Sequence, residues 1–184
     1  MRGTFRLITS IALCIGLSFG FAGLVSTSAK AQWTGCGVGV GGSIVIGTVD
    51  LGAPIDFSSS GQKADISGNC DLQAGSVVIG GFARYGHYFG DLKTLGVEND
   101  WTIGGRIGVL PTPSALFYGH AAYTRLDISG LGNVDGWRFG PGIEVKIGDS
   151  PLSVDLSAGY TVLDIADFAP PGIDARAYAV RLGF

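Results

Sequence analysis

The feature that most constrains the fold of this chain is an alternation of apolar with small or polar residues along much of its length. Between positions 137 and 147 the odd places hold Trp137, Phe139, Pro141, Ile143, Val145 and Ile147, and the even places hold Arg138, Gly140, Gly142, Glu144 and Lys146. A period of two puts alternate side chains on opposite faces of an extended strand, whereas a helix repeats at 3.6 residues. The segment therefore predicts a β-strand with one apolar face and one small or charged face.

The same alternation returns in other segments, which are separated by turn residues. It is clear over 101–109 and 152–162, and the last residues of the chain place Tyr178, Val180, Leu182 and Phe184 on one face. The pattern predicts eight strands, over residues 34–46, 61–73, 76–89, 101–110, 116–126, 137–147, 152–163 and 174–184. Pro141 predicts a bulge or local gap in its strand, because proline has no N–H to donate to a neighbour.

The links between these strands alternate in length. Short ones fall at 74–75, 111–115 and 148–151, and longer polar ones near 47–60, 90–100, 127–136 and 164–173. Short turns at one end and long loops at the other are typical of outer-membrane barrels. The fold class expected is therefore all-β, an eight-stranded antiparallel up-and-down transmembrane β-barrel.

Composition separates this barrel from a soluble β-sandwich, which would also alternate. The mean hydropathy is +0.38 and only 15% of residues are charged. In a sandwich the polar face is the wet exterior and should be large and charged, whereas the polar face here is mainly glycine with scattered arginine. We therefore expect the apolar faces to contact lipid, and the sheet to close, because unpaired backbone groups in hydrocarbon are costly.

The first 31 residues have the features of an export signal. Arg2 and Arg6 precede an apolar run from Leu7 to about Val25, and Ala29-Lys30-Ala31 fits a small-residue cleavage site. We expect a cleaved signal peptide over 1–31, Sec-type export, and a barrel domain over 32–184. A retained membrane anchor is the alternative, since the run approaches the roughly 20 residues of a spanning helix.

The charge of the mature chain argues against one class of partner. Removing Arg2, Arg6 and Lys30 leaves nine basic residues against 15 acidic ones, a formal charge of −6. Such a surface gives no reason to expect nucleic acid as a partner.

Four stretches give the chain a resemblance to the eight-stranded OmpA-like and opacity-type outer-membrane barrels of Gram-negative bacteria. They are WTGCGVGVGG at 33–42, WTIGGRIGVL at 101–110, ALFYGHAAYTRL at 115–126 and YAVRLGF at 178–184. The resemblance implies an integral outer-membrane location. It also implies that Tyr178, Val180, Leu182 and Phe184 form a C-terminal signal recognised by the barrel assembly machinery.

Cys36 and Cys70 are the two cysteines that remain after cleavage, and an exported chain meets an oxidising compartment. In an up-and-down barrel the start of the first strand and the end of the second lie level, and both cysteines have the outward parity. We predict a disulfide between adjacent strands, contributing roughly 3 to 4 kcal/mol by the chain-entropy estimate. Two free thiols are the alternative.

The inward faces carry several charged residues. The lumen of an eight-stranded barrel is only wide enough for side chains to fill it. The residues placed there are Arg84, Arg106, His120, Arg138, Glu144, Asp155 and Arg181, with Asp65 near the upper part of its strand. Buried charges need partners, so we expect Arg106 and Arg138 to form an ion-pair core with Glu144 and Asp155. The alternative is that these residues line a narrow pore and select its ions.

An enzymatic function would have to use His87 or His120, the two histidines of the chain. His87 has no serine two residues further along its strand, and His120 is expected to face inward, so no catalytic, cofactor-binding or metal-binding residue is predicted. A lipid-modifying outer-membrane enzyme stays as the third possibility, after a structural or surface-interaction role and a narrow porin-like channel.

The remaining expectations concern the surface of the barrel. Trp33 and Phe184 are assigned to an aromatic girdle at the periplasmic rim, and Tyr85, Trp101, Tyr123 and Trp137 to one at the outer rim. The protein is expected to be a monomer, with outer-membrane lipids and lipopolysaccharide as partners. Divalent cations could bridge lipopolysaccharide to the acids assigned to the loops, which are Asp50, Asp56, Asp91, Glu98, Asp100, Asp127, Asp135, Asp164, Asp167 and Asp174.

Overall fold

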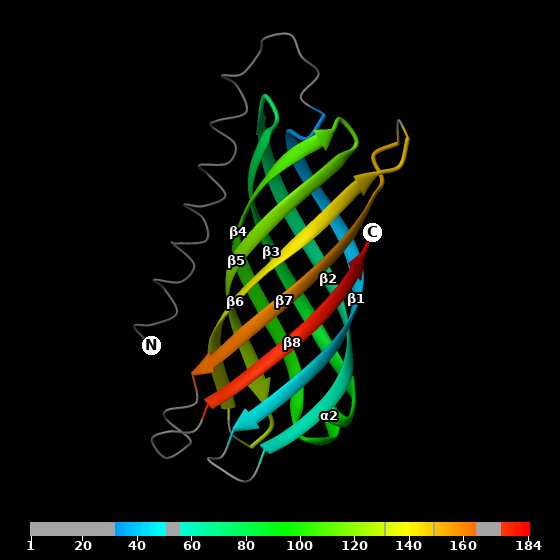
Figure 1. The fold of residues 1–184 in the computed structure, drawn as a ribbon. Helices are drawn as coiled ribbons and strands as arrows, with labels where there is room; N and C mark the ends of the chain where they lie inside the picture. The colour runs from blue at the N-terminus through cyan, green and yellow to red at the C-terminus, as the bar shows by residue number, and fades with distance from the viewer. Residues whose placement is uncertain (1–31, 51–55, 131, 149, 165–173) are drawn as a thin grey trace, which may run out of the picture. The chain divides into compact units, whose positions relative to one another are not determined.

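The chain forms a closed antiparallel barrel in which each strand pairs with the next and β8 returns to β1 (Figure 1). The computed structural model describes residues 32–50, 56–130, 132–148, 150–164 and 174–184, so the signal peptide expected over 1–31 lies outside the described residues. The strands are β1 (Gly35–Asp50), β2 (Asp56–Ala74), β3 (Val77–Gly90), β4 (Val97–Thr112), β5 (Ala115–Ile128), β6 (Gly132–Lys146), β7 (Ser153–Asp164) and β8 (Asp174–Gly183). The predicted fold class is confirmed.

The two ends of the barrel differ in their connections. At one end, here named the turn end, short links join β2 to β3, β4 to β5 and β6 to β7. At the opposite end, the loop end, the helix α2 (Asp91–Thr94) joins β3 to β4, as the lower part of Figure 1 shows. The strands run further toward the loop end than predicted, because pairs such as Asp127 with Asn133 continue the ladder. The loops are correspondingly shorter.

Strand parity separates a lipid-facing surface from an interior. Large apolar residues of the outward parity are exposed along the strands, among them Val38, Ile44, Ile107 and Val180, which are 93%, 63%, 58% and 56% exposed. The inward parity carries the buried polar residues, such as Lys63 and Arg106. An apolar exterior around a polar interior is the reverse of a soluble protein and is what a lipid solvent requires.

Apolar clusters pack inside the barrel near both ends. At the turn end Trp33, Val78, Leu116 and Tyr118 pack together, with Leu110 against them. Toward the loop end a second cluster contains Val45, Tyr88, Leu92 and Ala179. The charged side chains of the interior lie between these clusters, where bulk water is displaced and electrostatic interactions are strengthened.

Glycines on the inward faces make room for long side chains from the same strand or a neighbouring one. A Cβ atom at Gly159 would lie 2.4 Å from Nε of Arg138, and one at Gly142 would lie 2.3 Å from Cζ of Tyr118. A Cβ at Gly183 would lie 2.3 Å from Nη1 of Arg181. The absence of side chains at these places lets the arginines and the tyrosine lie flat across the wall.

Two features interrupt the wall. The β6–β7 ladder has no pair at Gly140 or Pro141, as expected from the missing N–H of proline, while the β5–β6 ladder is continuous there. In addition β8 stops before the turn end: Phe184 exchanges two backbone hydrogen bonds with Val40, of 3.0 and 2.8 Å, so the start of β1 extends past it.

In the described part of the chain, no helix has the length and apolar character needed to cross a membrane.

Candidate functional site

The site is the charged interior, and Arg106 on β4 is its best-connected side chain. Its Nε and Nη2 donate to the two carboxylate oxygens of Asp71 on β2, at 2.9 and 2.5 Å. Its Nη1 donates to Glu144 on β6 at 2.6 Å. All three side chains are nearly enclosed. A bidentate bond to one carboxylate and a further bond to another link three strands across the lumen.

Arg181 on β8 forms a second layer of the same kind. It donates to Asp65 on β2 through Nε and Nη2, at 2.9 and 2.8 Å from Oδ1, and to Asp155 on β7 through Nη1 at 2.8 Å. Tyr118 on β5 donates a short hydrogen bond to the other oxygen of Asp155. A third pair lies nearer the loop end, where Nζ of Lys63 is 2.8 Å from Asp100.

The structure departs from the expected pairing. Glu144 is bound by Arg106 as expected, but Asp155 is bound by Arg181, and Arg138 bonds neither carboxylate. Arg84 and His120 also lie in the lumen without an acid among their hydrogen-bond partners in the described residues. The reason is that contacts across a lumen depend on the relative height of distant strands, which parity does not specify.

Four members of the ion-pair layers were missed from the sequence: Lys63, Asp71, Asp100 and Tyr118. Lys63 and Asp71 have the same parity as Asp65, so the alternation in β2 could have revealed them. Asp100 was assigned to a loop, but β4 begins at Val97 and gives it the inward parity of Thr102 and Arg106. Asp100 lies one residue before the strand predicted over 101–110, whereas the other three residues lie within predicted strands.

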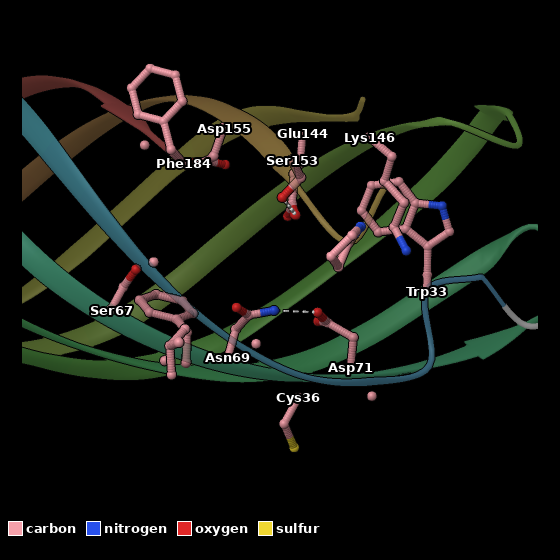
Figure 2. A pocket seen from close by; sticks show the side chains of 18 of the residues that line it. Trp33, Cys36, Ser67, Asn69, Asp71, Glu144, Lys146, Ser153, Asp155 and Phe184 are labelled. Atoms are coloured by element: carbon pink, nitrogen blue, oxygen red, sulfur yellow. Dashed lines mark hydrogen bonds between the residues drawn. The ribbon is translucent and has the colours of Figure 1, made fainter. Parts of the chain in front are cut away.

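A cavity of about 270 Å³ occupies the turn end of the lumen (Figure 2). Its walls carry both charge signs, from Asp71, Glu144 and Asp155 and from Arg84, Arg106 and Arg181. Backbone of β1 from Gly35 to Gly39 also lines it, on the side where β8 has ended at Phe184. The cavity therefore adjoins the shortened edge of the wall.

Trp33 closes part of this end and corrects the assignment to a rim girdle. The residue is 4% exposed, its Nε1 donates to the Pro113 carbonyl at 2.9 Å, and Nζ of Lys146 lies 4.7 Å from its ring centroid. Trp33 has the inward parity of β1, which continues back from Gly35, so its ring turns into the lumen. Lys146 also donates to the Gln32 carbonyl.

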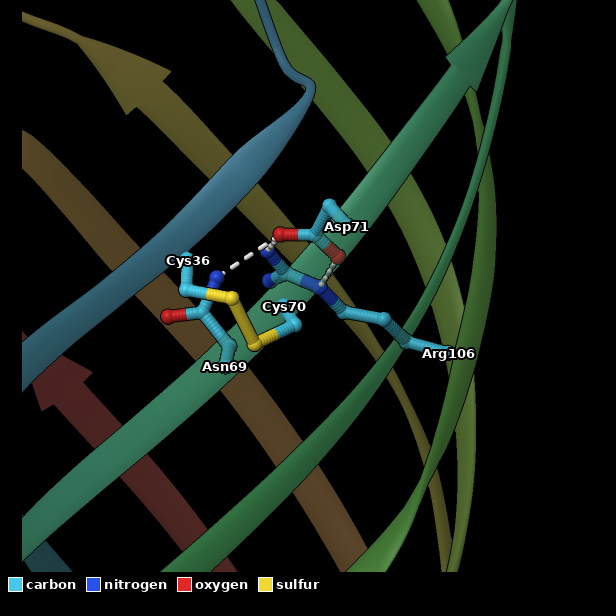
Figure 3. Close-up of a disulfide and its surroundings, with 5 residues drawn as sticks. All are labelled: Cys36, Asn69, Cys70, Asp71 and Arg106. Atoms are coloured by element: carbon cyan, nitrogen blue, oxygen red, sulfur yellow. Dashed lines mark hydrogen bonds and ion pairs between the residues drawn. A yellow bond between two sulfur atoms is a disulfide. The ribbon is translucent and has the colours of Figure 1, made fainter. Parts of the chain in front are cut away.

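The predicted disulfide is present. Cys36 and Cys70 are directly opposed in the β1–β2 ladder, are both exposed on the outer surface, and are joined by a sulfur–sulfur bond (Figure 3). Asp71 and Arg106 lie on the other side of the same wall. The covalent bond thus fixes β1 to β2 beside the layer in which Asp71 holds Arg106.

Aromatic residues of four adjacent strands meet on the outer surface toward the loop end. Trp101 and Tyr123 lie with ring centroids 5.5 Å apart, and Tyr123 and Trp137 are 5.9 Å apart. Arg125 stacks near Trp101 and Tyr123 and forms an ion pair with Asp135 at 2.5 Å. Tyr85 is opposite Trp101 in the ladder. Outer-membrane barrels carry such aromatic residues at the interface between the hydrocarbon core and the lipid headgroups, with charged residues beyond them.

The last strand presents its alternate apolar residues outward. Tyr178, Val180, Leu182 and Phe184 are 50%, 56%, 46% and 60% exposed, and Phe184 lies level with Val40 rather than at the rim. The continuous apolar row along β8 is available to lipid or to a protein that handles the unfinished barrel.

No cluster of three or more histidine, cysteine or acidic side chains suited to a metal ion occurs in the described residues. Of the acids assigned to loops, Asp100 binds Lys63, Asp135 binds Arg125, and Glu98 accepts from Ser129. The side chains of Asp50, Asp56, Asp167 and Asp174 lie outside the described part. His87 contacts Asn99 at 2.7 Å and Lys93 at 2.8 Å.

A family model described as the outer membrane protein beta-barrel domain matches residues 17–184. The chain belongs to this family. The outer-membrane barrel is accordingly an integral protein of the outer membrane, as its apolar exterior requires.

Solved structures share the barrel at low sequence identity. Ail, the attachment invasion locus protein of Yersinia pestis, is 7% identical with a TM-score of 0.43, covering 82% of this chain and 97% of Ail. Neisserial surface protein A is 16% identical with a TM-score of 0.44, covering 81% and 96%. The outer membrane enzyme PagL is 14% identical with a TM-score of 0.46, covering 78% and 98%. No curated protein matches the chain by sequence.

Proposed function

We propose that this outer-membrane barrel has a structural and surface-interaction role, with a lumen that is a packed core rather than a pore. The observation that supports the proposal is the occupation of the lumen. Its carboxylates at Asp65, Asp71, Asp100, Glu144 and Asp155 are each bonded to a cation from another strand. Apolar clusters stand at both ends of these layers.

The energetics of the layers support a closed lumen. An ion crossing the barrel would have to separate Arg106 from two carboxylates and Arg181 from two more. Breaking one buried pair costs about 3–5 kcal/mol, because it leaves an uncompensated charge. Both layers would have to open together, which makes a continuous path rare.

Single-channel recording in a planar lipid bilayer tests the proposal. We expect purified, refolded protein to give no discrete conductance steps. Reproducible steps whose amplitude changes in Arg106→Ala, and not in the outward-facing control Arg125→Ala, would favour the alternative of a narrow channel for ions or small solutes. The cavity at the turn end is the feature that favours this alternative.

The partners we propose are outer-membrane lipids, lipopolysaccharide and the barrel assembly machinery, with the protein acting as a monomer. The aromatic group of Trp101, Tyr123 and Trp137, with Arg125 above it, supports contact with anionic headgroups. Barrels reconstituted in phosphatidylcholine vesicles should unfold at a higher temperature when lipopolysaccharide is included. An equal midpoint in both vesicle types would contradict the lipopolysaccharide contact.

We propose that the barrel is not an enzyme. His87 contacts Asn99 and Lys93, with no serine or acid among its described hydrogen-bond partners, which supports a non-catalytic role. Overproduction should therefore leave the mass profile of lipid A and phospholipids unchanged. A new lipid species that disappears in His87→Ala would establish the lipid-modifying alternative.

A further inference from the structure

Three basic side chains in the middle of the lumen have buried nitrogens that lack a hydrogen-bond partner in the described residues. Arg138 and His120 are both 6% exposed, and Nε and Nη2 of Arg138 and both ring nitrogens of His120 have no hydrogen-bond partner in the described part of the chain. Nε of Arg84 is enclosed and equally without one. A buried polar group without a hydrogen bond is destabilising, and more so when it is charged.

These side chains belong to one cluster. They lie close enough to interact electrostatically: Arg138 and Arg84 both act on His120, and Arg138 acts on Arg84, while Asp155, which is bound by Arg181, acts on Arg84 and His120 with the opposite sign. The guanidinium of Arg84 lies 4.6 Å from the ring centroid of Phe82, which also meets the His120 ring edge-on at 5.9 Å. Arg138 lies flat over Gly159. Strands β3, β5 and β6 therefore direct three basic groups into a single region.

Each acid of the described lumen is already paired with another cation. Arg106 binds Asp71 and Glu144, Arg181 binds Asp65 and Asp155, and Lys63 binds Oδ2 of Asp100, whose Oδ1 has no hydrogen-bond partner in the described residues. A guanidinium only donates, and a neutral imidazole offers one acceptor. The cluster therefore holds several more donors than acceptors, which one water molecule, with two lone pairs, does not balance.

We propose that this cluster is a binding site for a small inorganic anion such as chloride, held by Arg84, Arg138 and His120. A monatomic anion accepts several N–H donors at once and supplies the negative charge that the two arginines lack. The inward residues beside the cluster on its own and adjacent strands are small, namely Gly104, Ala122, Gly140 and Gly159, and the Arg138 guanidinium occupies the place that a Cβ at Gly159 would take.

The turn-end cavity provides a route to the site. Arg84 forms part of its lining, so an anion that enters where β8 has ended reaches the first member of the cluster. Passage further toward the loop end meets Lys63 bonded to Asp100 and then the cluster of Val45, Tyr88, Leu92 and Ala179. The site is thus entered from one end and is compatible with a lumen that does not conduct.

Thermal unfolding of the purified barrel in detergent tests the site. Chloride is titrated against gluconate, an anion too large for a closed site, at constant ionic strength and pH. We expect the wild-type midpoint to rise by about 5 °C and to saturate, because a ligand that binds the folded state stabilises it by mass action. Arg138→Met should abolish the rise, and the outward-facing control Arg125→Met should retain it.

Bromide locates the ion directly. Crystals of the wild-type barrel grown in bromide should show an anomalous peak within hydrogen-bonding distance of the Arg138 guanidinium. If Arg138→Met does not fold, Arg84→Met takes its place in the titration. A wild-type midpoint that is independent of chloride, a response that persists in the variant, or diffraction showing only water at the cluster would each overturn the proposal.

Discussion

Arg106 is the residue whose loss should most disturb the interior, because it alone holds two carboxylates in the layer near the turn end. Arg106→Ala leaves Asp71 and Glu144 enclosed without their cation. We expect the free energy of unfolding to fall by about 3–5 kcal/mol in urea titrations followed by tryptophan fluorescence.

Arg125→Ala is the matched control for that experiment. Arg125 also forms an ion pair, but its side chain is 37% exposed and its partner Asp135 is 41% exposed. Exposed pairs contribute less than about 1 kcal/mol. Equal losses in the two variants would mean that the interior layers contribute no more than surface pairs.

Gly142 and Gly119 offer a second comparison at the scale of one methyl group. A Cβ at Gly142 would meet the Tyr118 ring, which donates to Asp155, whereas a Cβ at Gly119 has no heavy atom within 4 Å. Gly142→Ala should therefore lower the free energy of unfolding by about 1–3 kcal/mol. Gly119→Ala should be neutral or slightly stabilising. The same urea titration measures both, and a neutral Gly142→Ala would refute close packing of Tyr118 on this wall.

At the scale of elements, the disulfide fixes β1 to β2 beside the shortened edge of the barrel. The bond closes a segment with a sequence separation of 34. The chain-entropy estimate gives roughly 3–4 kcal/mol for such a loop. Cys36→Ser with Cys70→Ser should lower the unfolding free energy by that amount. Reductant should lower the unfolding free energy of the wild-type protein by the same amount and leave that of the double variant unchanged. A decrease in the double variant on adding reductant would mean that the reductant acts at another place than this disulfide.

Strand β8 carries the apolar row that the resemblance to outer-membrane barrels implies is an assembly signal. Phe184→Ala should reduce the folded barrel recovered in outer-membrane fractions several-fold, while refolding of the purified chain from urea into detergent stays unchanged. Phe89→Ala, at another exposed phenylalanine on the outer surface, is the control. Equal recovery of Phe184→Ala and the wild-type protein would argue against a signal at this position.

At the scale of the whole molecule, closure makes every strand depend on both neighbours, so unfolding should be cooperative and slow. Unboiled protein in dodecyl sulfate gels should migrate faster than boiled protein, because the closed barrel resists the detergent. Identical migration with and without boiling would contradict a closed, stable barrel.

Much of the fold could be predicted because parity is a local property. Ile143 and Leu156 face lipid, and Arg138 and Asp155 face the lumen, for reasons contained within each strand. The disulfide was predictable for a related reason: the end of β2 lies level with the start of β1 in any hairpin barrel. The lengths of the strands were harder to predict, since the parts of the strands that extend toward the loop end are polar and resemble loop sequence.

The partners inside the lumen could not be predicted in the same way. Arg181 and Asp65 are 116 residues apart, and they meet because β8 returns to β1 beside β2. The assignment of Trp33 to the rim was wrong for a similar reason, since the pocket of Val78, Leu116 and Tyr118 forms only after β3 and β5, two segments distant from Trp33 in the sequence, pack together.

The sequence by itself determined that this chain builds a lipid-facing barrel, because the alternation of apolar and small residues fixes which side of each strand meets hydrocarbon. The tertiary structure alone decided which charges neutralise one another, where Trp33 packs at the turn end, and which arginine nitrogens lack a hydrogen-bond partner in the described residues. The physical reason is that contacts across a closed barrel depend on the register of all its strands together, and the sequence of one strand does not specify the register of the others.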